Sequence, residues 1–140
     1  MSYTIMNNID YKVGIYIRLS REDEEKEKYQ ESESIGNQRT LLMQYIRQNK
    51  LNFISEYVDD GVSGTSFDRP AFNRMIADIE AGKINMVITK DLSRLGRNYV
   101  QSGLSIENYF PEHEVRFVAI LDNIDTAYDT SNNDIAPFKS

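Results

Sequence analysis

Two side chains that could act together on a phosphate lie at the end of the first strand-like segment. Residues 13–20 read Val-Gly-Ile-Tyr-Ile-Arg-Leu-Ser, in which apolar residues occupy every second position. Because alternate side chains of a strand share a face, Arg18 and Ser20 are predicted to point the same way. A hydroxyl held beside a guanidinium at the end of a strand could act as a nucleophile on a phosphate.

Further arginines extend this candidate site. Arg94 and Arg97 are three residues apart, so one helical turn would place them on one side. Arginine forks bind phosphate oxygens bidentately, and several of them around one hydroxyl would stabilise a phosphoryl-transfer transition state. The complete set of candidate site residues is Ser20, Arg18, Arg69, Arg94, Arg97, Gln38 and Asp60.

Each of these residues also has an ordinary structural interpretation. A single arginine is usually a solvated surface charge, and Asp59 and Asp60 could be turn residues. Tyr16 is expected to pack against a helix rather than to act in chemistry. Gln38 falls on an apolar helical stripe, where it is either satisfied locally or directed into a site. The hypothesis therefore depends on the combination of residues and not on any one of them.

The composition excludes several kinds of site. The 140 residues contain no Cys and one His, so disulfides, thiolate zinc sites and His-rich metal sites are excluded. The net charge of −6 includes seven acids and two lysines between positions 22 and 33, a net of −5, which leaves about −1 elsewhere. A signal-peptide pattern and a long apolar run are both missing, so a cytoplasmic protein is expected.

Strand-like and helix-like segments alternate along the chain. Strands are expected at 12–19, 53–58, 84–89 and 115–121, and helices at 34–49, from Pro70 to Gly82, and near 98–110. Residues 90–97 and 122–140 are expected to be loops. The pattern predicts an α/β fold with a mainly parallel sheet of four to five strands flanked by helices. Functional sites in such folds gather where the strands end, which is where Ser20, Asp60 and Arg94 lie in the sequence.

At the level of motifs, the chain resembles the catalytic domain of the serine recombinases, the resolvase/invertase group, from about Lys12 to Asp125. The segments that carry the resemblance are Tyr16-Ile17-Arg18-Leu19-Ser20, Ser34-Ile35-Gly36-Asn37-Gln38, Asp60-Gly61-Val62-Ser63-Gly64, Asp68-Arg69-Pro70 and Ser93-Arg94-Leu95-Gly96-Arg97. The resemblance implies a resolvase-like domain over 12–125 with a flavodoxin-like strand order, preceded by a lead-in over 1–11.

The resemblance also implies a reaction. Ser20 would attack a DNA phosphodiester and form a 5′-phosphoserine intermediate, and strands would be exchanged and rejoined without ATP. The four arginines of the set would bind or activate the phosphate, and Gln38 and Asp60 would support them. The resemblance implies no cofactor and no essential metal. It implies double-stranded DNA as the partner of the full-length protein, with self-association into dimers and tetramers.

Two features depart from the small resolvases. Ser93 stands where many of them have an Asp directly before the arginine, and Asp91 lies two residues earlier. The acidic stretch after Ser20 is also longer, and both features are similar to the large transposon-type serine recombinases. Residues 126–140 are therefore expected to be a truncated connector toward an oligomerisation helix and a DNA-binding region, which makes the chain a fragment.

Two other functions remain open from the sequence. The first is a phospho-receiver or flavodoxin-like regulatory module, because Asp59, Asp60 and Lys90 at strand ends superficially suit an aspartyl-phosphate site. That module would carry acids after its first strand, where this chain has Arg18 and Ser20. The second is a catalytically inert synapsis domain, against which the complete set of arginines argues.

Overall fold

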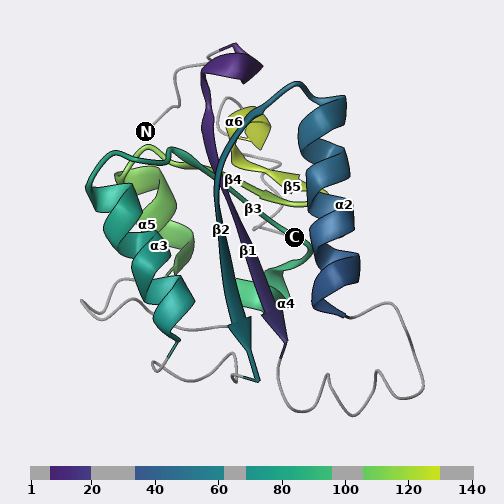
Figure 1. Cartoon of the computed structure of the whole chain (residues 1–140). Helices are drawn as coiled ribbons and strands as arrows, with labels where there is room; N and C mark the ends of the chain where they lie inside the picture. The colour runs from purple at the N-terminus through teal and green to yellow at the C-terminus, as the bar shows by residue number, and fades with distance from the viewer. Residues whose placement is uncertain (1–6, 20–33, 62–68, 96–105, 130–140) are drawn as a thin grey trace.

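Five strands form a sheet in the order β2-β1-β3-β4-β5 (Figure 1). The strands are β1 (Lys12–Leu19), β2 (Asn52–Asp60), β3 (Met86–Thr89), β4 (Arg116–Ala119) and β5 (Ile124–Asp125). Strands β1 to β4 are parallel, and β5 runs antiparallel to β4. The mainly parallel sheet and its flavodoxin-like order are therefore as the sequence predicted.

This architecture comes from a computed structural model that describes residues 7–19, 34–61, 69–95 and 106–129. The acidic stretch at 22–33 lies outside these ranges, as do Ser20 and Arg97. The structural statements that follow concern the described residues.

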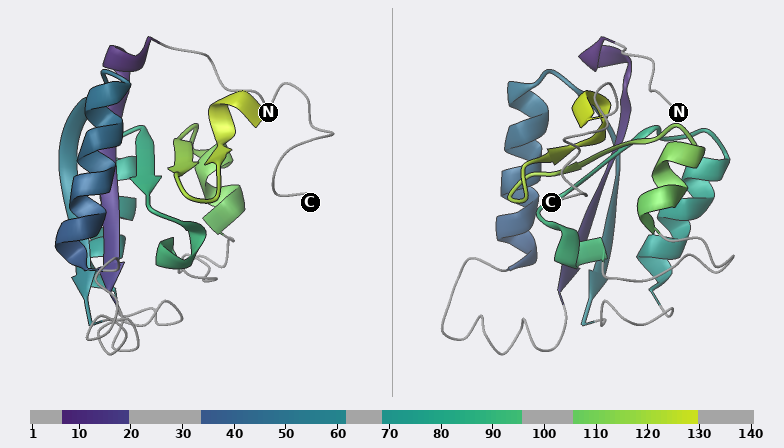
Figure 2. Two further views of the ribbon diagram at one scale, coloured as in Figure 1. Left: turned by 90° about the vertical axis from the view of Figure 1, so that its right-hand side faces the viewer. Right: turned by 180° about the vertical axis from the view of Figure 1, so that it is seen from behind.

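Helices cover both faces of the sheet. Helix α2 (Ile35–Gln48) lies on one face, and α3 (Pro70–Glu80) and α5 (Ile106–Glu112) lie on the other (Figures 1 and 2). The shorter elements are η1 (Asn8–Asp10), α4 (Leu92–Leu95) and α6 (Thr126–Asp129). Among the helices of the described ranges, none has the length and apolar character needed to cross a membrane.

Local sequence signals explain where the two longest helices begin. The Ser34 hydroxyl accepts the backbone N–H of Asn37 at 2.9 Å, so Ser34 is the N-cap of α2. Pro70 occupies the first turn of α3, where its missing N–H costs no helical hydrogen bond. These two starts fix which side chains of α2 and α3 face the sheet.

The central strand β1 is buried on both faces. Val13, Ile15 and Ile17 pack with α2, and Tyr16 packs in the cluster that includes residues of α3 and α5. Arg18 on this strand is also buried. A parallel strand with helices on both sides has no solvent face, so even its polar side chains must find partners inside the protein.

Three segments differ from the elements expected from the sequence. Residues 90–97, expected to be a loop, contain α4, and the expected loop after 121 contains β5 and α6. Helix α5 begins its described part at Ile106 and extends to Glu112, beyond the expected end at 110. Helix α4 has four residues and strand β5 has two, which is too short for periodicity to reveal either of them. Helix α4 also depends on contacts with distant segments.

Candidate active site

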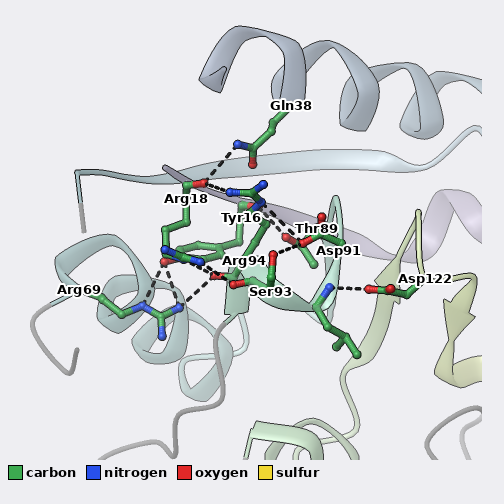
Figure 3. A network of polar contacts seen from close by, with 10 residues as sticks. Tyr16, Arg18, Gln38, Arg69, Thr89, Asp91, Ser93, Arg94 and Asp122 are labelled. Atoms are coloured by element: carbon green, nitrogen blue, oxygen red, sulfur yellow. Dashed lines mark hydrogen bonds and ion pairs between the residues drawn. The ribbon is translucent and has the colours of Figure 1, made fainter. Parts of the chain in front are cut away.

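Two arginines join the end of β1 to α4 by holding each other's backbone. The Arg18 guanidinium donates to the carbonyl of Arg94 (Nε, 2.9 Å) and to that of Ser93 (Nη2, 2.6 Å). In return, Nη1 of Arg94 donates to the carbonyl of Arg18 at 3.0 Å (Figure 3). Helix α4 is therefore tied directly to the strand whose last residue, Leu19, precedes Ser20 in the chain.

Gln38 reaches the same backbone position from the opposite face of the sheet. It lies on α2, is buried, and its Nε2 donates to the carbonyl of Arg18 at 3.2 Å. The polar residue on the apolar stripe of α2 is thus directed at the end of β1 (Figure 3). The Arg18 carbonyl accepts hydrogen bonds from both Gln38 and Arg94, which fixes the strand just before Ser20.

Arg69 brings a third guanidinium to this cluster. Its side chain is 1% exposed; Nε and Nη2 donate to the Tyr16 hydroxyl at 3.3 and 3.1 Å, and Nη2 lies 3.4 Å from the Arg94 carbonyl. The guanidinium carbon lies 4.1 Å from the centroid of the Phe72 ring, a cation–π contact. Nη1 is buried without a hydrogen-bond partner among the described residues, so it is a donor that a bound anion could satisfy.

Tyr16 is held by Asp59, which also fixes the start of α3. The Tyr16 hydroxyl donates to Asp59 Oδ2 at 2.8 Å, and the same carboxylate accepts the backbone N–H groups of Ala71 (2.9 Å) and Phe72 (3.0 Å). A carboxylate only accepts hydrogen bonds, so the Tyr16 proton points to Asp59 and its lone pairs face Arg69. Burial raises the pKa of Tyr16 above its ordinary value, against the opposing effect of the Arg69 charge.

Sequence reasoning did not include Asp59 and Tyr16 in the site. The Tyr16 ring does pack edge-on against Phe72 of α3, as expected, but its hydroxyl also positions Arg69. The sequence suggests Asp59 as a turn residue or as part of an aspartyl-phosphate site, whereas it is a buried residue of β2. Its position two residues after Tyr57, on the face that α3 covers, is the signal that could have identified it.

Of the remaining predicted residues, Asp60 alone lies in the described ranges. Asp60 is exposed at the end of β2, where it pairs in register with Leu19, and the N–H of Gly61 donates to the Leu19 carbonyl. Ser20 and Arg97 are not among the described residues. The structure thus brings together Arg18, Gln38, Arg69 and Arg94, and places Asp60 beside the end of β1.

The cluster is rich in buried positive charge. Besides the three arginines it has Lys90 nearby in sequence, buried directly after β3. The acidic partners are Asp59 beside Tyr16 and Asp91, whose Oδ1 lies 3.6 Å from Nε of Arg94. In the described ranges, no group of three or more His, Cys, Asp or Glu side chains is arranged to hold a metal ion. The chemistry available from the described side chains is the binding and polarisation of an anion by guanidinium groups.

Comparison with known proteins gives a consistent result. Residues 13–137 match the family described as "Resolvase, N terminal domain". A putative DNA recombinase of Bacillus subtilis (strain 168) is 34% identical over 85 residues, which make up 61% of this chain and 16% of that protein. The chain therefore spans about a sixth of this relative's length.

Two solved structures are similar in both fold and sequence. The N-terminal catalytic domain of TP901-1 integrase superposes with a TM-score of 0.64 and 29% identity, over 83% of this chain and 82% of that one. A resolvase family site-specific recombinase from Streptococcus pneumoniae has a TM-score of 0.65 and 29% identity, over 87% and 80%. With a family match that spans most of the chain and a fold that agrees, the protein belongs to the resolvase family and is a serine recombinase catalytic domain.

Proposed function

We propose that this domain cleaves and rejoins DNA strands with Ser20 as the nucleophile. One observation carries the proposal: the guanidinium groups of Arg18 and Arg69 both reach the carbonyl of Arg94, directly beside the strand that leads to Ser20. Three buried cations from three separate segments therefore meet at the end of β1. A convergence of this kind suits a phosphate whose negative charge increases during the reaction.

The reaction proceeds by transesterification. The Ser20 hydroxyl loses its proton, and its oxygen attacks the phosphorus of a DNA phosphodiester. The bond between phosphorus and the 3′ oxygen breaks, and the 3′ oxygen takes up a proton and leaves as a hydroxyl. The product is a 5′-phosphoserine. Attack by a 3′ hydroxyl of another strand reverses these steps and releases Ser20. The number of phosphate ester bonds stays constant, and rejoining therefore needs no ATP.

The side chains around Ser20 have different roles in this proposal. Arg18, Arg69, Arg94 and Arg97 neutralise the phosphate and favour the Ser20 alkoxide. Gln38 supports the site through the Arg18 carbonyl, to which its amide donates. Asp60 lies beside Leu19 in the parallel register, and Leu19 directly precedes Ser20 in the chain, so Asp60 is proposed to act on the nucleophile.

The domain is proposed to work within a longer cytoplasmic protein. Residues 12–125 form the catalytic domain, 1–11 lead into it, and 126–140 connect it to an oligomerisation helix and a DNA-binding region. The coverage of only 16% of the Bacillus subtilis relative supports such additional regions. Double-stranded DNA is the substrate, and two dimers assemble into a tetramer that holds two DNA sites.

The phospho-receiver alternative is less well supported. Its acceptor would be Asp59 or Asp60 at the end of β2. Asp60 is exposed, but it lies beside the end of β1, which carries Arg18 where a receiver would have acids. Asp59 is buried and accepts hydrogen bonds from Tyr16, Ala71 and Phe72. A carboxylate engaged in this way is a structural anchor rather than an exposed nucleophile. The inert synapsis domain is disfavoured by the convergence of three buried arginines and by Nη1 of Arg69, a buried donor without a hydrogen bond among the described residues.

The proposal is tested by trapping covalent protein–DNA adducts. The full-length protein is incubated with duplex fragments from the DNA that flanks its gene, denatured, and the DNA that remains attached to protein is sequenced. We expect wild-type protein to give adducts joined to 5′ ends and Ser20→Ala to give none. Adducts that persist in Ser20→Ala would refute the nucleophile, and transfer of phosphate from acetyl phosphate to Asp59 would favour the receiver.

A further inference from the structure

The carboxylate of Asp91 lies beside the side chain of Arg94. Asp91 directly precedes α4, and its carbonyl accepts the backbone N–H of Arg94 at 3.1 Å, so it occupies the N-cap position. A side chain at this position commonly accepts N–H groups of the first turn. Here Asp91 Oδ1 accepts the hydroxyl of Ser93 at 2.5 Å and lies 3.6 Å from Nε of Arg94.

A second carboxylate serves the backbone at the start of α4. Asp122, in the turn between β4 and β5, accepts the N–H of Leu92 at 2.6 Å (Figure 3). The two acidic residues therefore have separate tasks, although both lie at the same end of one short helix. Asp122 holds the backbone, and Asp91 contacts the Arg94 side chain.

The position of Asp91 restrains the Arg94 guanidinium from a second direction. Nη1 of Arg94 donates to the Arg18 carbonyl, and Nε faces Asp91. The Arg94 side chain is 5% exposed and that of Asp91 is 22% exposed, so solvent and salt screen this pair less than a surface ion pair. The contact of Nε with Asp91 is an ion pair at 3.6 Å rather than a hydrogen bond, so the charge of Asp91 attracts the side of the guanidinium that the Arg18 carbonyl does not hold.

We propose that Asp91 is a positioning residue that holds the Arg94 guanidinium in the orientation needed for strand cleavage, with the Ser93 hydroxyl fixing the Asp91 carboxylate. This inference rests on the proposed function for its effect on the reaction. The geometric part, the restraint of Arg94 by Asp91, can be tested without DNA.

The restraint is tested by NMR on the 140-residue chain through hydrogen exchange of the Arg94 Nε proton, assigned by its loss in Arg94→Lys. Asp91→Asn keeps the shape of the side chain and removes its charge, and we expect exchange to accelerate about fivefold or more. Ser93→Ala should cause a smaller change in the same direction. Glu56→Gln is the matched control, because Glu56 pairs with Arg39 and should leave the Arg94 signal unchanged. Unchanged exchange in Asp91→Asn would overturn the proposal.

The effect on the reaction is tested by measuring the single-turnover rate of adduct formation. The assay uses the full-length protein, and its substrate is the DNA that covalent trapping has identified. We expect Asp91→Asn to lower this rate on the order of tenfold, with DNA affinity unchanged and partial recovery in Asp91→Glu. In an Arg94→Lys background, Asp91→Asn should lower the rate of adduct formation by less than about twofold, because Asp91 acts through Arg94. Equal losses in both backgrounds, or no loss, would contradict the proposal.

The two measurements separate failure of this inference from failure of the proposed function. If wild-type protein forms no adduct, the recombinase mechanism fails, and the exchange measurement still decides whether Asp91 restrains Arg94. If adducts form and Asp91→Asn behaves as wild type in both assays, the mechanism stands and the role of Asp91 is refuted.

Discussion

Arg69 is positioned by a chain of single side chains that begins at the backbone of α3. The N–H groups of Ala71 and Phe72 hold Asp59, Asp59 holds the Tyr16 hydroxyl, and Tyr16 accepts from Arg69. Every step is buried, so the loss of one member leaves its neighbours without partners in a site that water reaches poorly. The orientation of the guanidinium is therefore built into the packing of α3 against β1 and β2.

Neighbouring aspartates allow this chain to be tested. Asp59→Ala removes the acceptor of Tyr16 and of two backbone N–H groups, and should lower the free energy of unfolding by about 3 kcal/mol. Asp60→Ala changes an exposed residue of the same strand and should alter the free energy of unfolding by less than about 0.5 kcal/mol. Urea unfolding of the 140-residue chain measures both. Equal values for the two variants would show that the Asp59 contacts contribute little stability.

Strand β1 packs closely against neighbouring side chains at Gly14. Gly14 lies on β1 at a shift in the register with β2, and a Cβ placed there would be 2.8 Å from Cδ1 of Ile84 and 2.9 Å from Cε2 of Tyr57. Glycine is needed at this point because no room exists for a methyl group. A Cβ placed at Gly36, in the first turn of α2, would have the Ser34 hydroxyl at 4.0 Å and no other described residue within 4 Å outside its own helix and chain neighbours.

The two glycines should therefore respond in opposite directions to the same change. Gly14→Ala forces the side chains of Ile84 and Tyr57 to move within a packed core and should destabilise the chain by about 1–3 kcal/mol. Gly36→Ala adds a methyl group that no described residue crowds, and it reduces the conformational entropy of the unfolded chain. It should therefore stabilise the folded protein by about 0.5–1 kcal/mol. Thermal or urea unfolding provides the comparison. A neutral Gly14→Ala variant would mean that β1 and Ile84 are not packed as described.

Across the domain, buried tyrosines donate hydrogen bonds to carboxylates of α3 and so hold this helix to β2 and α5. Tyr57 of β2 donates to Asp78 of α3 at 2.6 Å, and Tyr109 of α5 donates to Glu80 of α3 at 2.9 Å. Burial and the neighbouring carboxylate raise the pKa of Tyr57 to about 12, and the same causes raise the pKa of Tyr109. The stability of the layers that carry the site is thus linked to the protonated state of these hydroxyls.

This linkage predicts that the domain loses stability at alkaline pH. Above pH ~10 the unfolded chain releases its tyrosine protons while the folded chain retains them, so the free energy of unfolding falls as pH rises, by about 1.4 kcal/mol per pH unit for each such tyrosine. Tyr57→Phe should make the fall shallower by about that amount between pH ~10 and pH ~12. Urea unfolding across this range measures the slope.

A suitable control for the alkaline slope is Glu56→Gln. Interaction with Arg39 lowers the pKa of Glu56, so this carboxylate is ionised in both states throughout the range and its removal should leave the slope unchanged. A slope in Tyr57→Phe that equals the wild-type slope would show that Tyr57 ionises as readily in the folded chain as in the unfolded one.

Local patterns in the sequence were enough to establish the four parallel strands, the long helices and the family. The alternation through Val13 to Leu19, the N-cap at Ser34 and the Pro70 start are short-range signals, and each depends on contacts within a few residues. The mainly parallel sheet followed from the alternation of strands with helices, and the flavodoxin-like strand order was implied by the resemblance to the serine recombinases. The convergence of Arg18, Arg69 and Arg94 followed from the rule that parallel strands end at one edge.

Contacts between distant segments decided the rest. Helix α4 is held by Arg18, 75 residues from Ser93, and by Asp122, 30 residues from Leu92. The choice of Asp59 as the buried anchor depends on Tyr16, 43 residues away. The strength of such hydrogen bonds depends on burial and direction, and these are fixed only when the sheet and helices have packed. A periodic pattern carries no information about a partner that lies so far along the chain.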